Sequence, residues 1–201
     1  MNPLPARRRP RRTLALLVAV FLAPPLTAWL LYFGGWRPGH TVNYGILITP
    51  PRPVGPLELE RRGGGALDAK SLAGKWTLIQ VDRSPCDARC AHRLWVTRQV
   101  RITLGKDLDR VRRVLVLTGP GADPHARAMR AAHPDLIVAG GTPAQLARLY
   151  RWLDAGEARA VEGHVFLVDP RGNLMMRYPR DLKPEGLQKD LRRLLKYSRI
   201  G

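Results

Sequence analysis

Short apolar runs alternate with amphipathic stretches over the last two thirds of this 201-residue chain. The apolar runs have the length and composition of strands, which are predicted at residues 74–81, 113–118, 136–139, 164–168 and 174–178. The amphipathic stretches predict helices at residues 90–104, 124–132, 142–153 and 187–197. This order predicts the α/β fold class, with a mixed central sheet flanked by helices on both faces.

The N-terminal residues follow a different pattern. Residues 13–33 form one apolar run without a charged side chain, and about 20 such residues are enough to span a bilayer as a helix. Pro24 and Pro25 interrupt the run and predict a kink. The arginines that precede the run should stay in the cytoplasm: Arg7, Arg8, Arg9, Arg11 and Arg12. We therefore expect a single-pass protein of the bacterial inner membrane, with a basic cytoplasmic tail at residues 1–12 and a periplasmic C-terminal domain.

A cleaved signal peptide is the competing interpretation of the same residues. No small-x-small cleavage site follows the apolar run. Aromatic residues instead mark its end in the manner of an interfacial belt: Trp29, Tyr32, Phe33 and Trp36. These two features favour an uncleaved transmembrane helix.

Composition divides the remainder of the chain in two. Residues 34–71 are interrupted repeatedly by proline and glycine, including the triplet Gly63-Gly64-Gly65, which is typical of a linker. Regular alternation of strands and helices begins near residue 72. We therefore expect residues 72–201 to form the folded domain, since about 130 residues suffice for one hydrophobic core.

The formal net charge of the chain is +18. Part of this charge comes from the N-terminal arginines, and the other basic residues are scattered rather than clustered with aromatic residues. We therefore expect no nucleic-acid partner. A basic surface that faces anionic lipid or an acidic partner protein is the functional alternative.

Cys86 and Cys90 are the only cysteines, and they lie between the predicted strand at 74–81 and the following helix. Two thiols this close can form a disulfide, exchange one or bind a soft metal ion. A helix N-terminus and loop amides would help to stabilise a thiolate there. A plain structural disulfide is the alternative, although so small a loop gives little entropic stabilisation.

Three other residues have side chains that bind soft metals or tune thiols. His92 lies two residues beyond Cys90 and could supply a ligand or favour a thiolate, with an exposed helical histidine as the simpler interpretation. Met175 and Met176 follow the hairpin turn. Thioethers bind Cu(I), but packing is the favoured interpretation for both methionines.

Four segments of the chain, in a fixed order, carry a family resemblance. They are Gly74-Lys75-Trp76-Thr77-Leu78, Cys86-x3-Cys90, Gly140-Gly141-Thr142-Pro143-Ala144-Gln145-Leu146 and Phe166-Leu167-Val168-Asp169-Pro170-Arg171-Gly172. Together they resemble the Sco/SenC family of membrane-anchored periplasmic proteins. The resemblance covers about residues 72–198 and implies a thioredoxin-like domain.

Sco proteins are implicated in building the dinuclear copper centre of cytochrome c oxidase, as copper chaperones, thiol reductases or both. The resemblance implies that Cys86 and Cys90 form a redox dithiol and bind Cu(I) together with a histidine. Thiolate and imidazole ligands suit this ion. Val161 stands where the family has its histidine, and His164, three residues later, is the candidate third ligand. On a regular strand such an odd offset turns a side chain to the opposite face.

The preferred hypothesis is a Sco-like assembly factor that delivers Cu(I) or reduces a disulfide. Its partner would be a respiratory oxidase subunit or another copper-assembly protein. A metal-free, membrane-tethered thiol–disulfide oxidoreductase is the enzymatic alternative. The third hypothesis is a non-catalytic interaction protein that keeps the fold. The sequence does not decide between the three hypotheses.

Overall fold

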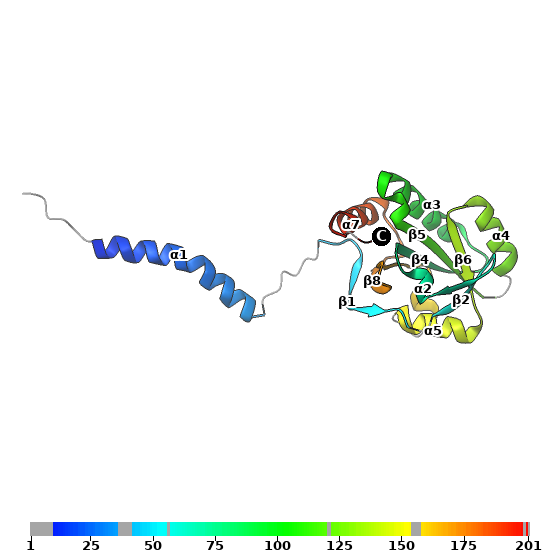
Figure 1. Ribbon diagram of the computed structural model, residues 1–201, viewed down its shortest axis with the longest axis horizontal. Coiled ribbons are helices and arrows are strands. Elements are labelled where there is room, and N and C mark those ends of the chain that lie inside the picture. Colours follow the sequence, from blue (N-terminus) through cyan, green and yellow to red (C-terminus); the bar gives the residue numbers. More distant parts are fainter. Residues whose placement is uncertain are drawn as a thin grey trace, which may run out of the picture. The chain divides into compact units, whose positions relative to one another are not determined.

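The computed structural model describes residues 10–35, 42–55, 57–119, 122–153, 158–198 and 200. The chain divides into two compact units, Met1–Val42 and Asn43–Gly201 (Figure 1). The first unit contains helix α1, and the second contains a sheet with its flanking helices. Each unit is described below by itself.

Helix α1 spans Pro10–Phe33 and continues through Pro24 and Pro25. Its axis bends along its length, as the two prolines predict (Figure 1). The Thr27 hydroxyl donates to the carbonyls of Ala23 and Pro24. The segment Arg11–Phe33 is long and apolar enough to cross a membrane, a test that a signal sequence also passes. Arg7, Arg8, Arg9 and Trp36, which entered the sequence argument, lie outside the described residues.

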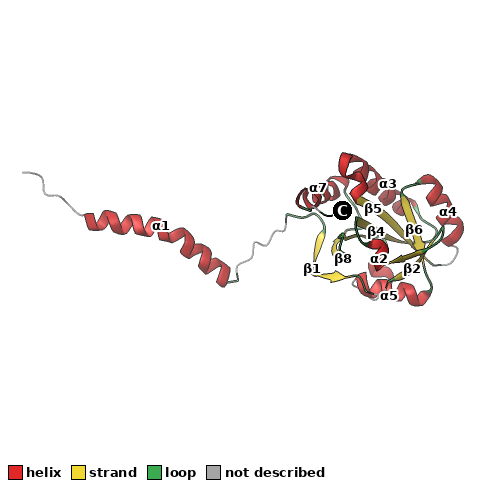
Figure 2. Ribbon diagram, viewed as in Figure 1, coloured by secondary structure: helices red, strands yellow, loops and turns green. Residues whose placement is uncertain are grey.

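The second unit is built on one mixed sheet in the order β1-β8-β7-β4-β5-β6-β2-β3 (Figure 2). Strand β4 pairs in parallel with β5, and β5 pairs in parallel with β6. The remaining pairs are antiparallel. The strands are β1 (Ile46–Pro53), β2 (Glu58–Arg61), β3 (Ala66–Asp68), β4 (Trp76–Arg83), β5 (Val111–Thr118), β6 (Leu136–Gly140), β7 (Val165–Val168) and β8 (Asn173–Tyr178).

Helices cover both faces of this sheet, as the α/β fold class predicts (Figure 1). Helices α3, α4 and α7 lie on one face, where α3 and α7 contact each other. Helix α5 packs on the other face. The helices are α2 (Ala69–Leu72), α3 (Ala88–Thr103), the 3-10 helix η1 (Gly105–Arg110), α4 (Ala122–Ala132), α5 (Pro143–Leu153), α6 (Ala158–Val161) and α7 (Pro184–Tyr197).

The central strand β4 is buried on both faces, and alternate residues enter different cores. Ile79 and Val81 pack with Phe166 and with the helix α5 leucines. Leu78 packs on the opposite face, with residues of α3 and α7. Apolar residues of β4 therefore hold both helical layers together, which accounts for the almost continuous apolar run in the sequence.

The structure corrects the expected linker at residues 34–71. Strands β1, β2 and β3 and helix α2 all lie within this range, and both edges of the sheet are made from it. The inward residues are leucines separated by breakers: Leu57, Leu59, Leu67 and Leu72. A strand of three or four residues shows too few inward positions to produce a visible period. The globular unit therefore begins at Asn43 rather than near residue 72.

The predicted hairpin near the C-terminus is confirmed, with β7 and β8 paired antiparallel. Its turn is closed by Asp169, whose carboxylate accepts the backbone N–H groups of Arg171 and Asn173. Gly172 occupies a left-handed conformation with φ of 85°, which a residue with a Cβ rarely adopts. The predicted closing helix begins three residues earlier than expected, at Pro184, because proline is favoured in a first helical turn.

Asp190 on α7 ties the start of the globular unit to its end. Its side chain is buried, at 3% exposure for the residue. It accepts the backbone N–H of Tyr44 at 3.1 Å and that of Gly45 at 2.8 Å. Burial, together with the nearby Asp190 carboxylate, raises the pKa of Tyr178 well above its ordinary value. The carboxylate thus satisfies two backbone donors that would otherwise be left buried and unpaired.

Replacing Asp190 by alanine should therefore destabilise the globular unit by about 2–4 kcal/mol, because charge-assisted hydrogen bonds are lost and buried amides are orphaned. Urea unfolding of the globular unit measures this change in the free energy of unfolding. Asp109→Ala is the matched control, since the Asp109 side chain is 83% exposed, and it should change stability by less than about 0.5 kcal/mol. Equal effects of the two substitutions would contradict this assignment.

Candidate functional site

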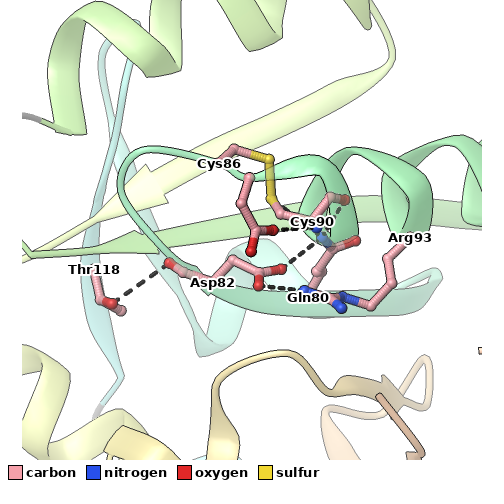
Figure 3. Close-up of a disulfide and its surroundings, with 7 residues drawn as sticks. Gln80, Asp82, Cys86, Cys90, Arg93 and Thr118 are labelled. Atoms are coloured by element: carbon pink, nitrogen blue, oxygen red, sulfur yellow. Dashed lines mark hydrogen bonds and ion pairs between the residues drawn. A yellow bond between two sulfur atoms is a disulfide. The ribbon is translucent and has the colours of Figure 1, made fainter. Parts of the chain in front are cut away.

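The two cysteines lie at the carboxyl ends of the parallel strands β4 and β5, where the chain turns from β4 into helix α3 (Figure 3). They are joined in a disulfide, with their Cα atoms 5.3 Å apart. Cys86 lies in the connecting loop and Cys90 lies in the first turn of α3. The sheet and the helix therefore position the two sulfurs together, as the four-residue spacing predicts.

The two cysteines differ in their exposure. Cys90 is 1% exposed and packs in the core between α3, α4 and the sheet, whereas Cys86 is only partly buried. Asp87 begins helix α3, and its carboxylate accepts the backbone N–H of Cys90 at 2.8 Å. An attacking thiol from another molecule therefore meets Cys86 first, and Cys90 is protected behind it.

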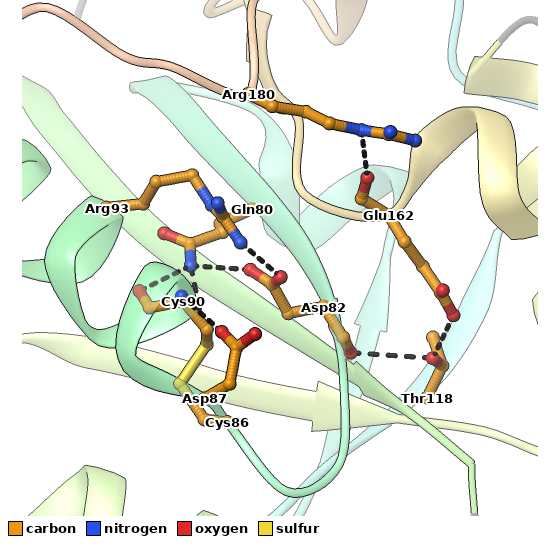
Figure 4. Close-up of polar contacts among 9 residues, drawn as sticks. All are labelled: Gln80, Asp82, Cys86, Asp87, Cys90, Arg93, Thr118, Glu162 and Arg180. Carbon is orange, nitrogen blue, oxygen red and sulfur yellow. Dashed lines mark hydrogen bonds and ion pairs between the residues drawn. A yellow bond between two sulfur atoms is a disulfide. The ribbon is translucent and has the colours of Figure 1, made fainter.

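A buried polar network lies beneath Cys90 (Figure 4). Gln80 Nε2 donates to Asp82 Oδ2 at 2.7 Å and to the Cys90 carbonyl at 3.1 Å, and it lies 3.7 Å from Cys90 Sγ. Arg93 Nη2 donates to Asp82 Oδ1 at 2.5 Å. All three side chains are buried, so an ion pair lies inside the domain beside the apolar cluster in which Cys90 packs.

The protonation of Asp82 is set by opposing effects. Burial raises the pKa of Asp82, and the Gln80 hydrogen bond and the charge of Arg93 oppose this effect without reversing it. Asp135 behaves in the opposite way. Burial acts to raise its pKa, but the hydrogen bond and charge of Arg113 outweigh burial and lower it. Asp82 thus binds a proton more readily in the folded state than an ordinary aspartate does.

A second chain of contacts leads from Asp82 across the sheet edge (Figure 4). The Thr118 hydroxyl on β5 lies 3.4 Å from the Asp82 carbonyl and donates to Glu162 Oε1 at 2.9 Å. The carbonyl of Glu162 accepts Arg180 Nε at 3.0 Å. Loops that lie far apart in the sequence are therefore fixed around the cysteines by polar contacts.

An open cleft of about 1020 Å³ adjoins the disulfide loop. The loop residues on either side of Cys86 line it, as do His92 on α3 and the Glu162–Arg180 pair on the opposite wall. Its lining mixes acidic and basic side chains. Cys86 and Cys90 are not among the residues that line the cleft, so the loop that carries Cys86 forms one of its walls while the sulfurs lie outside it.

His164 lies immediately before β7, and Val161, at the family's ligand position, is buried in a core. The His164 ring lies 6.3 Å from that of Phe166, on the face of β7 that packs against helix α5. Cys90 packs on the opposite face of the sheet. Among the described residues, no group of three or more His, Cys, Asp and Glu side chains is arranged to hold a metal ion.

The protonation of His164 can be read from its contacts. Its Nδ1 lies 2.8 Å from the Tyr178 carbonyl, which can only accept a hydrogen bond, so this nitrogen carries the proton. Burial lowers the pKa of His164, and nearby arginines lower it further against the opposing effect of the carbonyl. The neutral form of the His164 imidazole is therefore favoured, and its role as a ligand stays a prediction.

The other candidates have simpler environments. His92 is exposed and stacks on Trp95 with ring centroids 5.9 Å apart. Met176 is buried in the core with Tyr178, and Met175 packs at the edge of the same core. Packing therefore accounts for both methionines, as expected.

Gln80, Asp82 and Arg93 are site residues that the sequence did not predict. A signal was present, because Gln80 and Asp82 are polar residues two positions apart within an otherwise apolar strand. A period of two places both side chains on one face. The face is the one that Cys90 approaches, which only the packing of α3 against β4 determines.

The fold and site define a thioredoxin-like domain with a paired-cysteine site between the first central strand and its helix. The family model described as "transmembrane-like, thioredoxin-like, C-terminal domain" matches residues 76–198, and the chain belongs to this family. A search of curated proteins gave no match.

Solved structures of Sco proteins share this fold. ScoI from Bradyrhizobium japonicum with copper bound is 25% identical, with a TM-score of 0.56, over 70% of this chain and 98% of that chain. Yeast Sco1 with copper bound is 20% identical, with a TM-score of 0.62, over 74% and 91%. BsSco, described by its disulfide switch, is 15% identical, with a TM-score of 0.58, over 76% and 99%. The resemblance to the Sco family is confirmed, and the low identities fit a diverged member.

The raised pKa of Asp82 gives a testable pH dependence. Because its pKa is higher in the folded than in the unfolded state, its contribution to stability is complete below the unfolded value of about 3.9 and is lost as pH rises through the folded value. The free energy of unfolding of the wild type, relative to that of Asp82→Asn, should therefore fall as pH rises through this window. Asp135→Asn should show the opposite slope, and parallel slopes would contradict the assignment.

Proposed function

We propose that this protein is a membrane-anchored thiol–disulfide exchange protein of the Sco type, which reduces a disulfide in a client during assembly of a cytochrome c oxidase. The observation that carries the proposal is the disulfide between a partly exposed Cys86 and a buried Cys90, placed beside an open cleft. A solved relative is described as having a disulfide switch and as belonging to a family of cytochrome c oxidase assembly proteins.

The exchange proceeds in two steps. In the reduced protein, the Cys86 thiolate attacks one sulfur of the client disulfide, and the other client sulfur leaves as a thiolate. Cys90 then attacks Cys86 Sγ, which re-forms the Cys86–Cys90 disulfide and releases the second client thiolate. Two electrons pass to the client, and the protons of the two thiols end on the client sulfurs. A dithiol donor must then reduce the disulfide again.

The local structure favours this order of attack. Cys86 lies just before the first turn of α3, where the helix dipole favours a thiolate. Cys90 is shielded from solvent, so it reacts with Cys86 rather than with a second client. Its position one helical turn away brings its sulfur onto Cys86 without movement of the sheet.

The second part of the proposal concerns the membrane anchor. We propose that α1 is an uncleaved helix in the bacterial inner membrane, with the N-terminus cytoplasmic and the globular unit periplasmic. An apolar helix of sufficient length supports this proposal, as does the basic sequence that precedes it. Tethering the dithiol to the membrane raises its effective concentration near an integral-membrane client.

Substituting Cys90 by serine should trap the client. Without the second thiol, the mixed disulfide between Cys86 and the client cannot be resolved, so a covalent complex accumulates. Non-reducing electrophoresis of full-length Cys90→Ser, purified from membranes, measures this complex. Cys86→Ser is the matched control, since its remaining thiol is buried. Equal trapping by both variants, or by neither, would contradict the proposed order of attack.

Delivery of Cu(I) is the second candidate function, and the copper-bound Sco structures favour it. Here the ion is cargo, taken from a donor and passed to an oxidase subunit or another copper-assembly protein. The reduced thiolates of Cys86 and Cys90 would bind it as soft ligands. His164 is the third ligand that the resemblance proposes, and its unprotonated Nε2 has the form that a ligand needs.

Titration of Cu(I) into the reduced globular unit against a competing chelator tests this candidate. We expect binding through the two sulfurs, abolished in Cys86→Ser/Cys90→Ser. We expect His164→Ala to change Kd by no more than about threefold, because its ring lies on the face of β7 away from Cys90. His92→Ala is the matched control. A large loss in His164→Ala alone would make His164 a ligand, and failure of the wild type to compete would exclude copper delivery.

A further inference from the structure

Gln80 is the buried side chain that touches the reactive pair from inside the domain. It lies in the middle of β4 with 2% exposure. One N–H of its carboxamide points at the Asp82 carboxylate, while the same nitrogen lies 3.1 Å from the Cys90 carbonyl and 3.7 Å from Cys90 Sγ. The second N–H is thus shared between a carbonyl oxygen and a disulfide sulfur, which is a weak acceptor.

The other end of the carboxamide is unsatisfied. Gln80 Oε1 is buried and has no hydrogen-bond partner among the described residues. A buried carbonyl without a donor costs stability. In the oxidised site, one Gln80 N–H therefore meets a weak sulfur acceptor, and the carbonyl oxygen of the same side chain has no partner among the described residues.

The carboxamide is held in this orientation by charge. Asp82 accepts the Gln80 N–H with one carboxylate oxygen and Arg93 with the other. Rotating the amide would place its oxygen against the Asp82 carboxylate, which is repulsive when Asp82 is ionised. The ion pair therefore aims the nitrogen of Gln80 toward Cys90.

We propose that Gln80 is a positioning residue that stabilises the sulfur of Cys90 once the disulfide opens, and so sets the reduction potential of the Cys86–Cys90 pair. This inference rests on the proposed exchange function. A thiolate is a much stronger acceptor than a disulfide sulfur, so the shared N–H bonds it when Cys90 is ionised.

This contact stabilises the reduced protein, and only its weak form, to a disulfide sulfur, exists when the pair is oxidised. A pair whose reduced form is stabilised has a higher potential. Removing the Gln80 carboxamide should therefore favour the disulfide and make the pair more strongly reducing. It should also slow the second exchange step, because Cys90 is less well prepared for attack on the mixed disulfide.

The test is redox equilibration of the full-length protein with glutathione, in which the dithiol and oxidised glutathione exchange with the disulfide and two reduced glutathiones. For Gln80→Leu we expect the equilibrium to move about tenfold toward the protein disulfide, which corresponds to a potential about 30 mV more negative. The lifetime of the mixed disulfide with glutathione should lengthen in the same variant. Gln80→Asn keeps the amide, but its side chain is one methylene too short to reach the sulfur of Cys90. We therefore expect the same shift in potential. This variant gives the result if Gln80→Leu does not fold.

Thr77→Val is the matched control, because Thr77 is a buried polar residue of the same strand whose hydroxyl donates to the nearby Lys75 carbonyl. A destabilised strand alone would move the potentials of Thr77→Val and Gln80→Leu alike, and that result overturns the inference. An unchanged reduction potential in both Gln80 variants also overturns the inference about Gln80. In that case, exchange by the wild type with glutathione would still support the proposed function. If the wild type does not exchange with glutathione or with a client, the proposed function itself fails.

Discussion

The ion pair between Asp82 and Arg93 is the interaction on which the site depends. Burying two charges is costly unless each is paired and hydrogen-bonded, and here the carboxylate receives Arg93 on one oxygen and Gln80 on the other. Arg93 comes from α3 and Asp82 from β4, so the pair joins the helix that carries Cys90 to the strand beneath it. The Gln80 carboxamide, which Asp82 orients, thereby lies beside the sulfur of Cys90.

The position of β4 explains why this strand carries the site. It lies between a parallel neighbour, β5, and an antiparallel neighbour, β7, and both its faces are covered. The carboxyl ends of β4 and β5 meet at one edge, where loops open toward solvent and helix α3 begins. The same edge brings Thr118 of β5 to the β4 carbonyl of Asp82. The partly exposed sulfur of Cys86 therefore lies at the end of the sheet, outside the two faces that the helices cover.

The likeness to the copper-bound Sco structures is a likeness of fold. Val161 is buried in the core, at the end of the short helix α6, and His164 packs beside Phe166. The neighbouring position is occupied by Glu162, which bonds Thr118. Around the two sulfurs, the structure places a carboxamide beside Cys90 and acidic and basic side chains along the adjoining cleft.

The sequence by itself determined the order of the main strands and helices, the apolar N-terminal helix and the closeness of Cys86 to Cys90, while it left disulfide formation, exchange and metal binding open. Each of these follows from local periodicity or from spacing along the chain. Only the tertiary structure decided that residues 46–68 supply both edges of the sheet, because short strands gain their stability from partners far away in sequence. It also decided that Gln80 and Asp82 meet Cys90 and Arg93 while His164 faces away, since the packing of α3 on β4 determines which side chains share a site.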